Sequence, residues 1–318
     1  MPEPKAETKV LLLGSEGQLG QTLLQVCGLG LGKGQGLDAG YTLTAWSRQQ
    51  VDICDEPALW AMLDQLQPDL LINAAAYTAV DAAEQHSAEA YAVNATAVTS
   101  LARWTVANAA WLLHLSTDFV FAGDCNRPYT PQDPTGPLGV YGQSKLAGEQ
   151  ALTSLAPAHS CIIRTSWLYS PYGRNFVKTM LQLMRQRDSL KVVADQLGTP
   201  CSTFSLSRCI LAALHHRPTG IYHWSDAGSA SWHEFALAIQ QQAMALGLLK
   251  RTIPIHPIPA SEYPTPARRP AYSVLDKHDT TATLGCTPRP WSSELHEVLT
   301  QMRDLESGAA THSDTLRG

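Results

Sequence analysis

The sequence predicts an α/β protein: a doubly wound, Rossmann-like parallel sheet with a smaller C-terminal lobe. Two observations favour this class. Short apolar segments alternate with segments of helical periodicity along the first half of the chain, and a glycine turn, "GSEGQLG", directly follows the first apolar segment. Such alternation is typical of right-handed β-α-β units, which build a parallel sheet covered by helices on both faces.

The expected strands are short and mostly apolar, as strands buried on both faces are. They cover residues 10–13, 41–47, 68–76, 110–121 and 159–169. Helical periodicity fills the intervals between them, at residues 18–27, 57–67, 87–108 and 141–155. We therefore expect residues 9–165 to form the dinucleotide-binding domain.

Beyond residue 170 the alternation loosens. Helices are expected at residues 175–188 and 231–247, a strand and loop at 190–200, and a strand at 220–226. Prolines crowd residues 254–270, where missing N–H groups disfavour regular structure. We expect residues 166–305 to form a substrate-binding lobe partly interleaved with the sheet, and residues 306–318 a disordered tail.

The bulk composition excludes several classes of protein. Of 318 residues, 44% are hydrophobic and 16% charged, as in a globular protein, and the net charge of −5 argues against a nucleic-acid partner. No apolar run approaches the roughly 20 residues of a membrane helix, and the N-terminus lacks a signal peptide's apolar segment. The seven cysteines are odd in number and scattered, so we expect a cytoplasmic protein with reduced thiols and no metal site.

The glycine turn after the first strand is the better of two candidate nucleotide loops. Gly14, Gly17 and Gly20 lie between an expected strand and an expected helix. In this position glycine permits a tight turn, close approach of a pyrophosphate and close packing of the helix on the strand. The helix N-terminus then favours the anion.

The second candidate, "GLGLGKGQG" at residues 28–36, does not have the pattern of a P-loop. Gly34 follows Lys33 where a magnesium-binding hydroxyl belongs, and Cys27 stands where the first glycine of that motif should be. We expect a connection on the opposite side of the sheet.

Three polar residues predict proton transfer near the sheet edge. Thr117 lies towards the end of the fourth expected strand, and Tyr141 and Lys145 share one face at the start of the next helix. A phenol with a pKa of about 10 is a poor acid or base at neutral pH. We expect the neighbouring ammonium, with an oxidised nicotinamide, to lower that pKa.

Several long motifs together resemble the extended short-chain dehydrogenase/reductase family. They are the glycine turn, "NAAAYTAVDAAE", "LSTDFVF", "YGQSKLAGE", "IRTSWLY" and "YPTPARRPAYSVLD", and the resemblance spans residues 9–300. It implies hydride transfer from NAD(P)H to the 4-keto group of dTDP-4-dehydro-6-deoxy-L-mannose, which gives dTDP-L-rhamnose. It also implies a nucleotide-sugar substrate, no membrane partner, and a monomer or homodimer.

The resemblance assigns roles to individual residues. Thr117, Tyr141 and Lys145 match the catalytic trio, with Tyr141 as proton donor, Lys145 on the nicotinamide ribose and Thr117 on the carbonyl. The cofactor-binding positions are Gly14, Gly17, Gln18, Leu19, Gly20, Ser47, Arg48, Asp52, Ile53, Asn73, Ala74, Ala75, Ala76, Tyr77, Asn94, Tyr141 and Lys145. The substrate-binding positions are Thr78, Val80, Asp118, Phe119, Trp167, Asn175 and Arg269. Arg268 is an alternative to Arg269, and Trp167 could instead be an aromatic plug at the end of a strand.

Three departures from the family pattern matter. Phe119 stands where a tyrosine is common, so one hydroxyl contact is lost. Ser47 and Arg48 replace the acidic residue that binds the adenosine ribose of NADH, and arginine suits a 2′-phosphate, so we expect NADPH. Thr22 stands where some relatives hold a dimer-bridging magnesium with glutamate.

Two other functions remain open from the sequence. The same fold resembles the non-catalytic β subunit of methionine adenosyltransferase, a regulatory protein that keeps the nucleotide site. The chain also resembles other nucleotide-sugar reductases and epimerases, although no additional acid or base for an epimerase stands out in the sequence.

Overall fold

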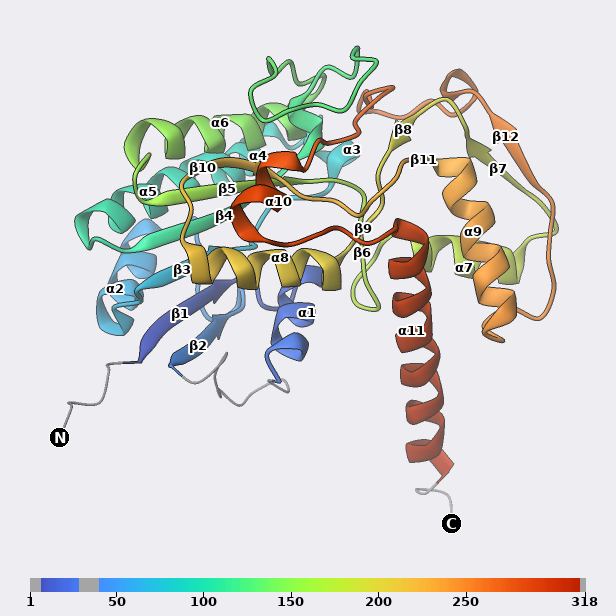
Figure 1. Cartoon of the computed structure of the whole chain (residues 1–318), viewed down its shortest axis with the longest axis horizontal. Coiled ribbons are helices and arrows are strands. Elements are labelled where there is room, and N and C mark those ends of the chain that lie inside the picture. The colour runs from blue at the N-terminus through green and yellow to red at the C-terminus, as the bar shows by residue number, and fades with distance from the viewer. Residues whose placement is uncertain (1–6, 29–39, 315–318) are drawn as a thin grey trace.

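A six-stranded parallel sheet forms the centre of the protein (Figure 1). The computed structural model describes residues 7–28 and 40–314. The strands are β1 (Thr8–Leu13), β2 (Tyr41–Trp46), β3 (Leu70–Asn73), β4 (Trp111–Thr117), β5 (Ser160–Thr165) and β10 (Gly220–His223), and their order across the sheet is β10-β5-β4-β3-β1-β2. Every pairing is parallel. The predicted doubly wound sheet is confirmed, and its direction of winding reverses between β1 and β3.

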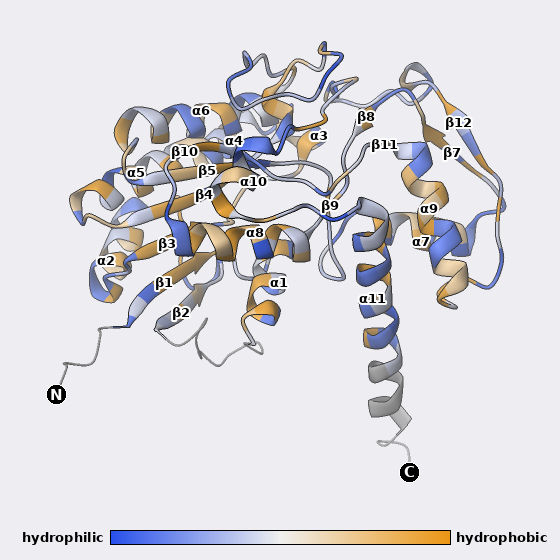
Figure 2. Cartoon of the chain, in the orientation of Figure 1, coloured by the Kyte–Doolittle hydropathy of each residue, from blue (hydrophilic) through white to orange (hydrophobic). Residues whose placement is uncertain are grey.

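Helices cover both faces of this sheet, and alternate residues of each strand pack against them. One face carries α1 (Gln18–Val26), α8 (Thr203–His216) and α10 (His278–Leu284); the other carries α2 (Glu56–Leu66), α5 (Ala97–Ala107) and α6 (Val140–Leu155). In β1, Val10 and Leu12 join the first cluster, and Leu11 and Leu13 join the second. This double burial explains why the strands are mostly apolar (Figure 2).

A second apolar core lies in the C-terminal lobe. It is built by α7 (Phe176–Gln186), α9 (Trp232–Ala245) and α11 (Trp291–Asp314), beside the parallel pair β7 (Leu190–Val193) and β12 (Ile255–Ile258). Two smaller pairs link this lobe to the sheet: β6 (Leu168–Tyr169) with β9 (Cys201–Ser202), and β8 (Leu197–Gly198) with β11 (Ala230–Ser231). The boundary at residue 165 stays a prediction, since β10, α8 and α10 return to the sheet.

The expected helix at residues 87–108 contains an irregular segment. It consists of α4 (Ser87–Tyr91), a π-helical turn η1 (Ala92–Thr96) and α5, and it follows the short helix α3 (Val80–Ala83). π turns of this kind frequently mark functional sites. Here the turn carries Asn94, which is buried.

Two expected strands end earlier than predicted. β4 stops at Thr117, and the 3-10 turn η2 (Asp118–Val120) follows it, because the Thr117 hydroxyl accepts a hydrogen bond from the N–H of Phe119 at 3.2 Å. The strand expected at 159–169 is divided into β5 and β6, because Trp167 between them adopts a left-handed φ of 43°.

Two predictions for the C-terminal third were wrong. Residues 254–270 contain β12 and the 3-10 turn η3 (Ala260–Glu262); β12 pairs with β7 in a two-stranded sheet, where a proline can be accommodated on a strand edge. The tail expected to be disordered from residue 306 continues α11 to Asp314. Leu295, Val298 and Leu299 anchor that helix in the core, and each further turn adds backbone hydrogen bonds at little cost.

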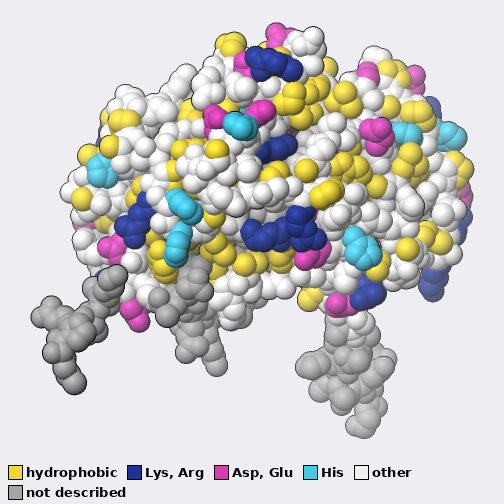
Figure 3. Space-filling view, in the orientation of Figure 1, with side chains coloured by type: hydrophobic (Ala, Val, Ile, Leu, Met, Phe, Trp, Pro, Cys, Tyr) yellow, Lys and Arg dark blue, Asp and Glu magenta, His cyan; other side chains and the backbone are white. Residues whose placement is uncertain are grey.

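The glycine-rich segment at residues 28–36 lies, apart from Gly28, outside the described residues. Within the described ranges, no helix is both long and apolar enough to cross a membrane. On the face in Figure 3, basic and acidic side chains are interspersed across the described surface.

Candidate active site

The glycine turn joins β1 to α1 and leaves room for an anion. Gly14 has a φ of +84°, and a Cβ there would lie 2.7 Å from the backbone N of Ala75 in the loop after β3. A Cβ at Gly20 would overlap the carbonyl oxygen of Gly14, so only glycine allows α1 to start this close to β1. Gly17 caps α1 without a side chain, which leaves the helix N-terminus open to a phosphate.

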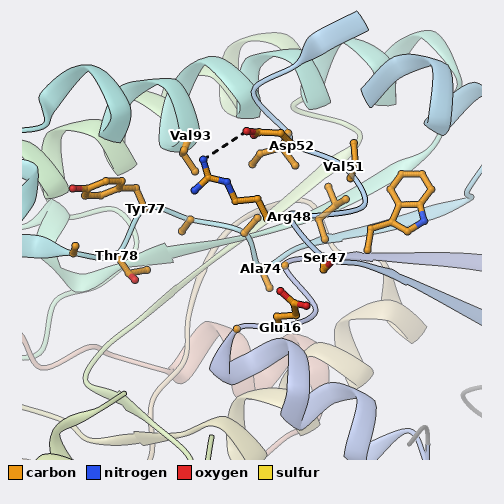
Figure 4. Close-up of a pocket in the computed structure, with 17 residues that line it drawn as sticks. Glu16, Ser47, Arg48, Val51, Asp52, Ala74, Tyr77, Thr78 and Val93 are labelled. Atoms are coloured by element: carbon orange, nitrogen blue, oxygen red, sulfur yellow. Dashed lines mark ion pairs between the residues drawn. The ribbon is translucent and has the colours of Figure 1, made fainter. Parts of the chain in front are cut away.

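A cavity of about 360 Å³ opens beside this turn, at the carboxyl ends of β1, β2 and β3 (Figure 4). This is the switch point of the sheet, where doubly wound proteins bind nucleotides. The predicted cofactor residues that line it are Gly14, Gly17, Ser47, Arg48, Asp52, Ile53, Ala74, Ala75, Ala76 and Tyr77, and Thr78, predicted for the substrate, lines it too. The sequence did not indicate six further lining residues, which lie at the same strand ends, turns and helical segment: Leu13, Glu16, Trp46, Val51, Ala79 and Val93.

Arg48 is the cation of this cavity. Its side chain is 82% exposed and Nη2 lies 3.6 Å from Oδ2 of Asp52 (Figure 4). An exposed pair at this separation contributes little to stability. The guanidinium therefore remains available to an anionic group of a ligand.

Several predicted cofactor residues do not line the cavity. Two of them hold its walls in place through hydrogen bonds. Asn94 in the π turn accepts a hydrogen bond from the N–H of Tyr77 at 2.9 Å, and donates to the Tyr77 carbonyl at 3.1 Å and to the Ser144 hydroxyl at 3.0 Å. Asn73 accepts from the N–H of Ala75 at 3.2 Å. These buried amides fix the loop after β3 and join it to α6.

Three further members of the predicted cofactor set lie in the first turn of α1. Leu19 and Gly20 are buried against the sheet. Gln18 accepts hydrogen bonds through Oε1 from Asn175 at 2.9 Å and from Ser170 at 3.2 Å. Gln18 thus connects α1 to the C-terminal lobe.

Tyr141 and Thr117 meet at the carboxyl end of β4. Tyr141 is in the first turn of α6, whose first N–H, that of Val140, donates to Oε1 of Glu84 at 2.9 Å. The Tyr141 ring packs edge-on against Phe119, with 5.7 Å between the ring centroids. A hydrogen bond connects its hydroxyl with the Thr117 side chain.

The predicted lowering of the Tyr141 pKa was wrong for this structure. Burial raises the pKa of Tyr141 to about 12, and the hydrogen bond with Thr117 opposes that rise, while the charge of Asp118 adds to it. The Lys145 ammonium does not act on the phenol here, because it is directed towards β4. At neutral pH Tyr141 is therefore a protonated phenol, the form that can donate a proton.

Lys145 is buried one helical turn beyond Tyr141. Its Nζ donates to the carbonyl of Leu115 at 2.6 Å and lies 3.3 Å from Nε2 of His114. Burial lowers the pKa of Lys145 to about 8, although the charge of Glu149 favours the ammonium. His114, whose Nδ1 lies 3.1 Å from the Asn73 amide, was missed; a polar residue inside an apolar strand was the available signal.

A buried ion pair anchors α6 to the central sheet. Arg164 in β5 donates to Glu149 in α6 through Nη2 at 2.6 Å and through Nε at 2.9 Å, and the Ser116 hydroxyl donates to the same carboxylate at 2.5 Å. This ties α6 to β4 and β5, the two strands whose ends carry the site. Sequence reasoning missed this pair as well.

Asp118, predicted to contact the substrate, is a buried carboxyl group with a free oxygen. Oδ1 accepts from the Thr117 hydroxyl at 3.1 Å, whereas Oδ2 has no hydrogen-bond partner among the described residues. Burial raises the pKa of Asp118 to about 6, and hydrogen bonding by Ser273 and Thr117 opposes the rise. A buried unpaired oxygen beside Thr117 suits a ligand hydroxyl.

Trp167 lies face to face with Trp232, with 3.4 Å between ring centroids and planes 7° apart. Its left-handed φ of 43° is a strained conformation for an aromatic residue, and such strain frequently occurs at ligand sites. The packing is also what an aromatic plug would give, so both roles predicted for Trp167 remain open.

A second cavity, of about 390 Å³, lies in the C-terminal lobe. Its walls combine aromatic and aliphatic side chains with two cations: Phe176, Thr179, Met180, Leu183, Leu190, Lys191, Val192, Val193, Gln196, Trp232, Tyr263, Thr265 and Arg269. Arg269 lines this cavity, whereas Arg268 is exposed and does not, and the expected contact of Arg269 with a diphosphate stays a prediction.

Five predicted substrate residues lie outside both cavities: Asp118, Phe119 and Trp167, described above, and Val80 and Asn175. Asn175 caps α7: its Oδ1 accepts from the N–H of Lys178 at 3.1 Å, and its amide donates to the carbonyl of Ser170 at 2.8 Å. Val80 begins α3. Asn175 thus has a local role at the start of α7, and its expected contact with the diphosphate stays a prediction.

The position where some relatives place magnesium does not have suitable ligands. The Thr22 side chain is buried in α1, and its hydroxyl is 2.7 Å from that of Thr203 in α8. Magnesium prefers carboxylates and water in octahedral geometry. In the described parts of the chain, no group of three or more His, Cys, Asp or Glu side chains could hold a metal ion.

The fold, the glycine turn and the Tyr–Lys pair define a Rossmann-type nucleotide-binding protein with a site for proton transfer. The sequence profile of the RmlD substrate binding domain matches residues 8–304, so the chain belongs to that family.

Individual relatives cover nearly the whole chain. A dTDP-4-dehydrorhamnose reductase of Aggregatibacter actinomycetemcomitans is 37% identical over 297 residues, 91% of this chain and 98% of that protein. The dTDP-4-keto-6-deoxy-D-glucose reductase of Streptomyces niveus is 34% identical over 299 residues, 93% of this chain and 98% of that protein. The crystal structure of dTDP-4-dehydrorhamnose reductase from Bacillus anthracis in complex with NADP is 32% identical and has a TM-score of 0.84, covering 93% of this chain and 99% of that one.

Proposed function

We propose that this protein is an NADPH-dependent reductase that converts dTDP-4-dehydro-6-deoxy-L-mannose into dTDP-L-rhamnose. The observation that carries the proposal is the arrangement of Tyr141, Thr117 and Lys145 at the carboxyl end of β4, next to the dinucleotide-type cavity. The names of the relatives support the same reaction class.

The residues of the chain fit a bound dinucleotide. The glycine turn and the open N-terminus of α1 would hold the pyrophosphate, and Arg48 would pair with the 2′-phosphate that distinguishes NADPH from NADH. Ser47 beside it has no carboxylate to repel that phosphate. The complex of the Bacillus anthracis relative with NADP supports this choice. Bound NADPH supplies the hydride.

The proton comes from the protein. Tyr141 is a protonated phenol, since burial raises its pKa to about 12, and it donates to the sugar oxygen as negative charge develops there. Thr117 orients that oxygen from the end of β4. Lys145, held against the Leu115 carbonyl, would bind the nicotinamide ribose through its ammonium group. Asp118 offers its unpaired Oδ2 to a hydroxyl of the hexose.

The nucleotide end of the substrate belongs in the second cavity. Phe176, Trp232 and Tyr263 provide aromatic surface for a base, and Arg269 and Lys191 provide charge for a diphosphate. We assign this cavity to a substrate-binding lobe spanning residues 166–305. We further propose that the protein is cytoplasmic and acts as a monomer or homodimer. All seven cysteines are free thiols, which suits a reducing compartment.

A second sugar is possible for the same chemistry. The Streptomyces niveus relative is named for a different 4-keto sugar at nearly the same identity. The two keto sugars differ in configuration at C3 and C5, and reduction of either at C4 would use the same Tyr141 proton, so we expect the sugar contacts at Asp118 and Trp167 to decide between the two substrates.

The test is NADPH oxidation by the purified full-length chain with each dTDP-4-keto sugar, generated enzymatically. We expect turnover with the L-manno substrate, and NMR of the product should show the rhamno configuration. Turnover confined to the 6-deoxy-D-gluco substrate would favour the second sugar. Tight binding of NADPH without turnover of either sugar would overturn the reductase and favour a non-catalytic regulatory subunit.

A further inference from the structure

Asp81 and Arg269 form an ion pair between the loop beside the cofactor cavity and the C-terminal lobe. Asp81 belongs to α3, just after Thr78, and Arg269 follows 188 residues later in the chain. Nη1 of Arg269 donates to Oδ1 at 3.1 Å, and Nη2 donates to Oδ2 at 2.8 Å. The N–H of Ala267 also donates to Oδ1, at 3.2 Å. This bidentate geometry fixes the plane of the guanidinium.

The Arg269 guanidinium is engaged along one edge only. Besides Asp81, Nη1 contacts the Thr265 hydroxyl and the carbonyl of Ala267, the latter at 3.1 Å. Within the described chain, Nε donates no hydrogen bond and Nη2 donates only to Asp81. In a planar guanidinium, the N–H of Nε and the second N–H of Nη2 form a fork on the other edge.

That second edge is the part of Arg269 a ligand can reach. Arg269 lines the second cavity and its side chain is 25% exposed, although Asp81, Thr265 and Ala267 occupy the first edge. A fork of two N–H groups matches two oxygens of a phosphate. Lys191, which lines the same cavity, supplies a second positive charge.

We propose that Asp81 is a positioning residue for the nucleotide-sugar diphosphate. It accepts hydrogen bonds from one edge of the Arg269 guanidinium, so that the other edge can bind a phosphate through two N–H groups. This rests on the proposed function, which places the nucleotide in the second cavity. Without Asp81, only Thr265 and the Ala267 carbonyl hold Arg269, and both contact the same Nη1 atom. The guanidinium can then rotate, and the fork is no longer fixed towards the cavity.

A double-mutant cycle tests this coupling. Isothermal titration of the full-length chain with dTDP would compare wild type, Asp81→Asn, Arg269→Gln and the double variant. We expect Asp81→Asn to weaken dTDP binding about tenfold, and Arg269→Gln by that much or more, as for a lost charge-assisted hydrogen bond. Because Asp81 acts through Arg269, the double variant should bind no more weakly than Arg269→Gln alone.

Three comparisons separate positioning from a general structural role. Asp188→Asn, which breaks the Arg251–Asp188 pair (2.8 Å) elsewhere in the C-terminal lobe, should leave dTDP affinity unchanged. Asp81→Asn should raise the KM for the sugar nucleotide and leave kcat and the NADPH Kd within about twofold, the pattern of lost uniform binding. Asp81→Glu, which keeps the charge, should restore part of the affinity and guards against misfolding of the asparagine variant.

The outcomes also separate this inference from the proposed function. Wild-type affinity for dTDP in Asp81→Asn, or a full additional loss in the Arg269→Gln background, overturns the positioning role alone. Wild type that binds dTDP with the predicted coupling but reduces neither keto sugar overturns the reductase and leaves the positioning role supported. Wild type that does not bind dTDP overturns both.

Discussion

Replacement of Gly14 by alanine should damage the cofactor cavity more than the fold. At a φ of +84° an alanine costs about 1–2 kcal/mol in backbone strain. Its Cβ would also lie 2.7 Å from the backbone N of Ala75, whereas ordinary contact starts at 3.4 Å, so the loop must retreat by roughly 0.7 Å. That loop forms one wall of the cavity. We expect the Kd for NADPH to rise at least about tenfold, because charge-assisted hydrogen bonds to the phosphates worth about 1.5–3 kcal/mol each are displaced.

Gly247→Ala is the matched control. Gly247 has a φ of +75°, but a Cβ there meets no atom within 4 Å, so only backbone strain of about 1–2 kcal/mol is expected. Thermal denaturation and NADPH titration of both variants measure the two effects. Gly247→Ala should lose a few degrees in Tm with unchanged NADPH affinity. If Gly14→Ala bound NADPH as tightly as wild type, the close approach of the glycine turn to the loop after β3 would not matter for the cofactor.

Three further predictions concern charged groups. Arg48→Ala should lower kcat/KM for NADPH about tenfold and leave that for NADH unchanged, as for one lost charge-assisted contact to phosphate; equal losses for both cofactors would contradict the role of Arg48. The free-enzyme profile of kcat/KM should fall as pH rises through about 8, where Lys145 loses its proton, and a flat profile to pH 10 would exclude that requirement. For Asp118, the pKa of about 6 in the folded protein exceeds the ordinary pKa of 3.8 for an aspartate, so between these two values the folded state binds the extra proton and wild-type stability falls as pH rises. Asp118→Asn has no carboxyl group to titrate, so the difference between its Tm and that of wild type should shift in favour of the variant by a few degrees from pH 4 to pH 7. A Tm difference that does not change with pH would show that the Asp118 carboxyl group does not titrate in this range.

The first half of the fold was accessible from sequence because its signals are local. β1 and the glycine turn are adjacent in the chain, and the strands are apolar because both faces are covered. The π turn around Asn94 has no comparable signal, since it depends on hydrogen bonding to Tyr77 and Ser144, residues brought near only by the fold. β12 was missed because proline argues against a strand interior, and the pairing with β7 that accommodates it is not local.

In the candidate site, too, the sequence indicated the features that are local in the chain and missed those that depend on tertiary contacts. Thr117, Tyr141 and Lys145 lie at strand and helix ends whose positions periodicity predicts, and the structure brings Thr117 and Tyr141 together. The direction of the Tyr141 pKa could not be predicted, because it depends on burial and on where the Lys145 side chain points. The pair Asp81–Arg269 joins residues 188 positions apart, a contact that no periodicity indicates.

The proton donated by Tyr141 is the central claim, and turnover of Tyr141→Phe measures it most directly. Removal of the hydroxyl should reduce kcat for the dTDP-4-keto sugar by about 100-fold or more, as expected for loss of a general acid, while the Kd for NADPH stays at the wild-type value. A Tyr141→Phe variant that reduces the sugar within a few fold of the wild-type rate would contradict the account.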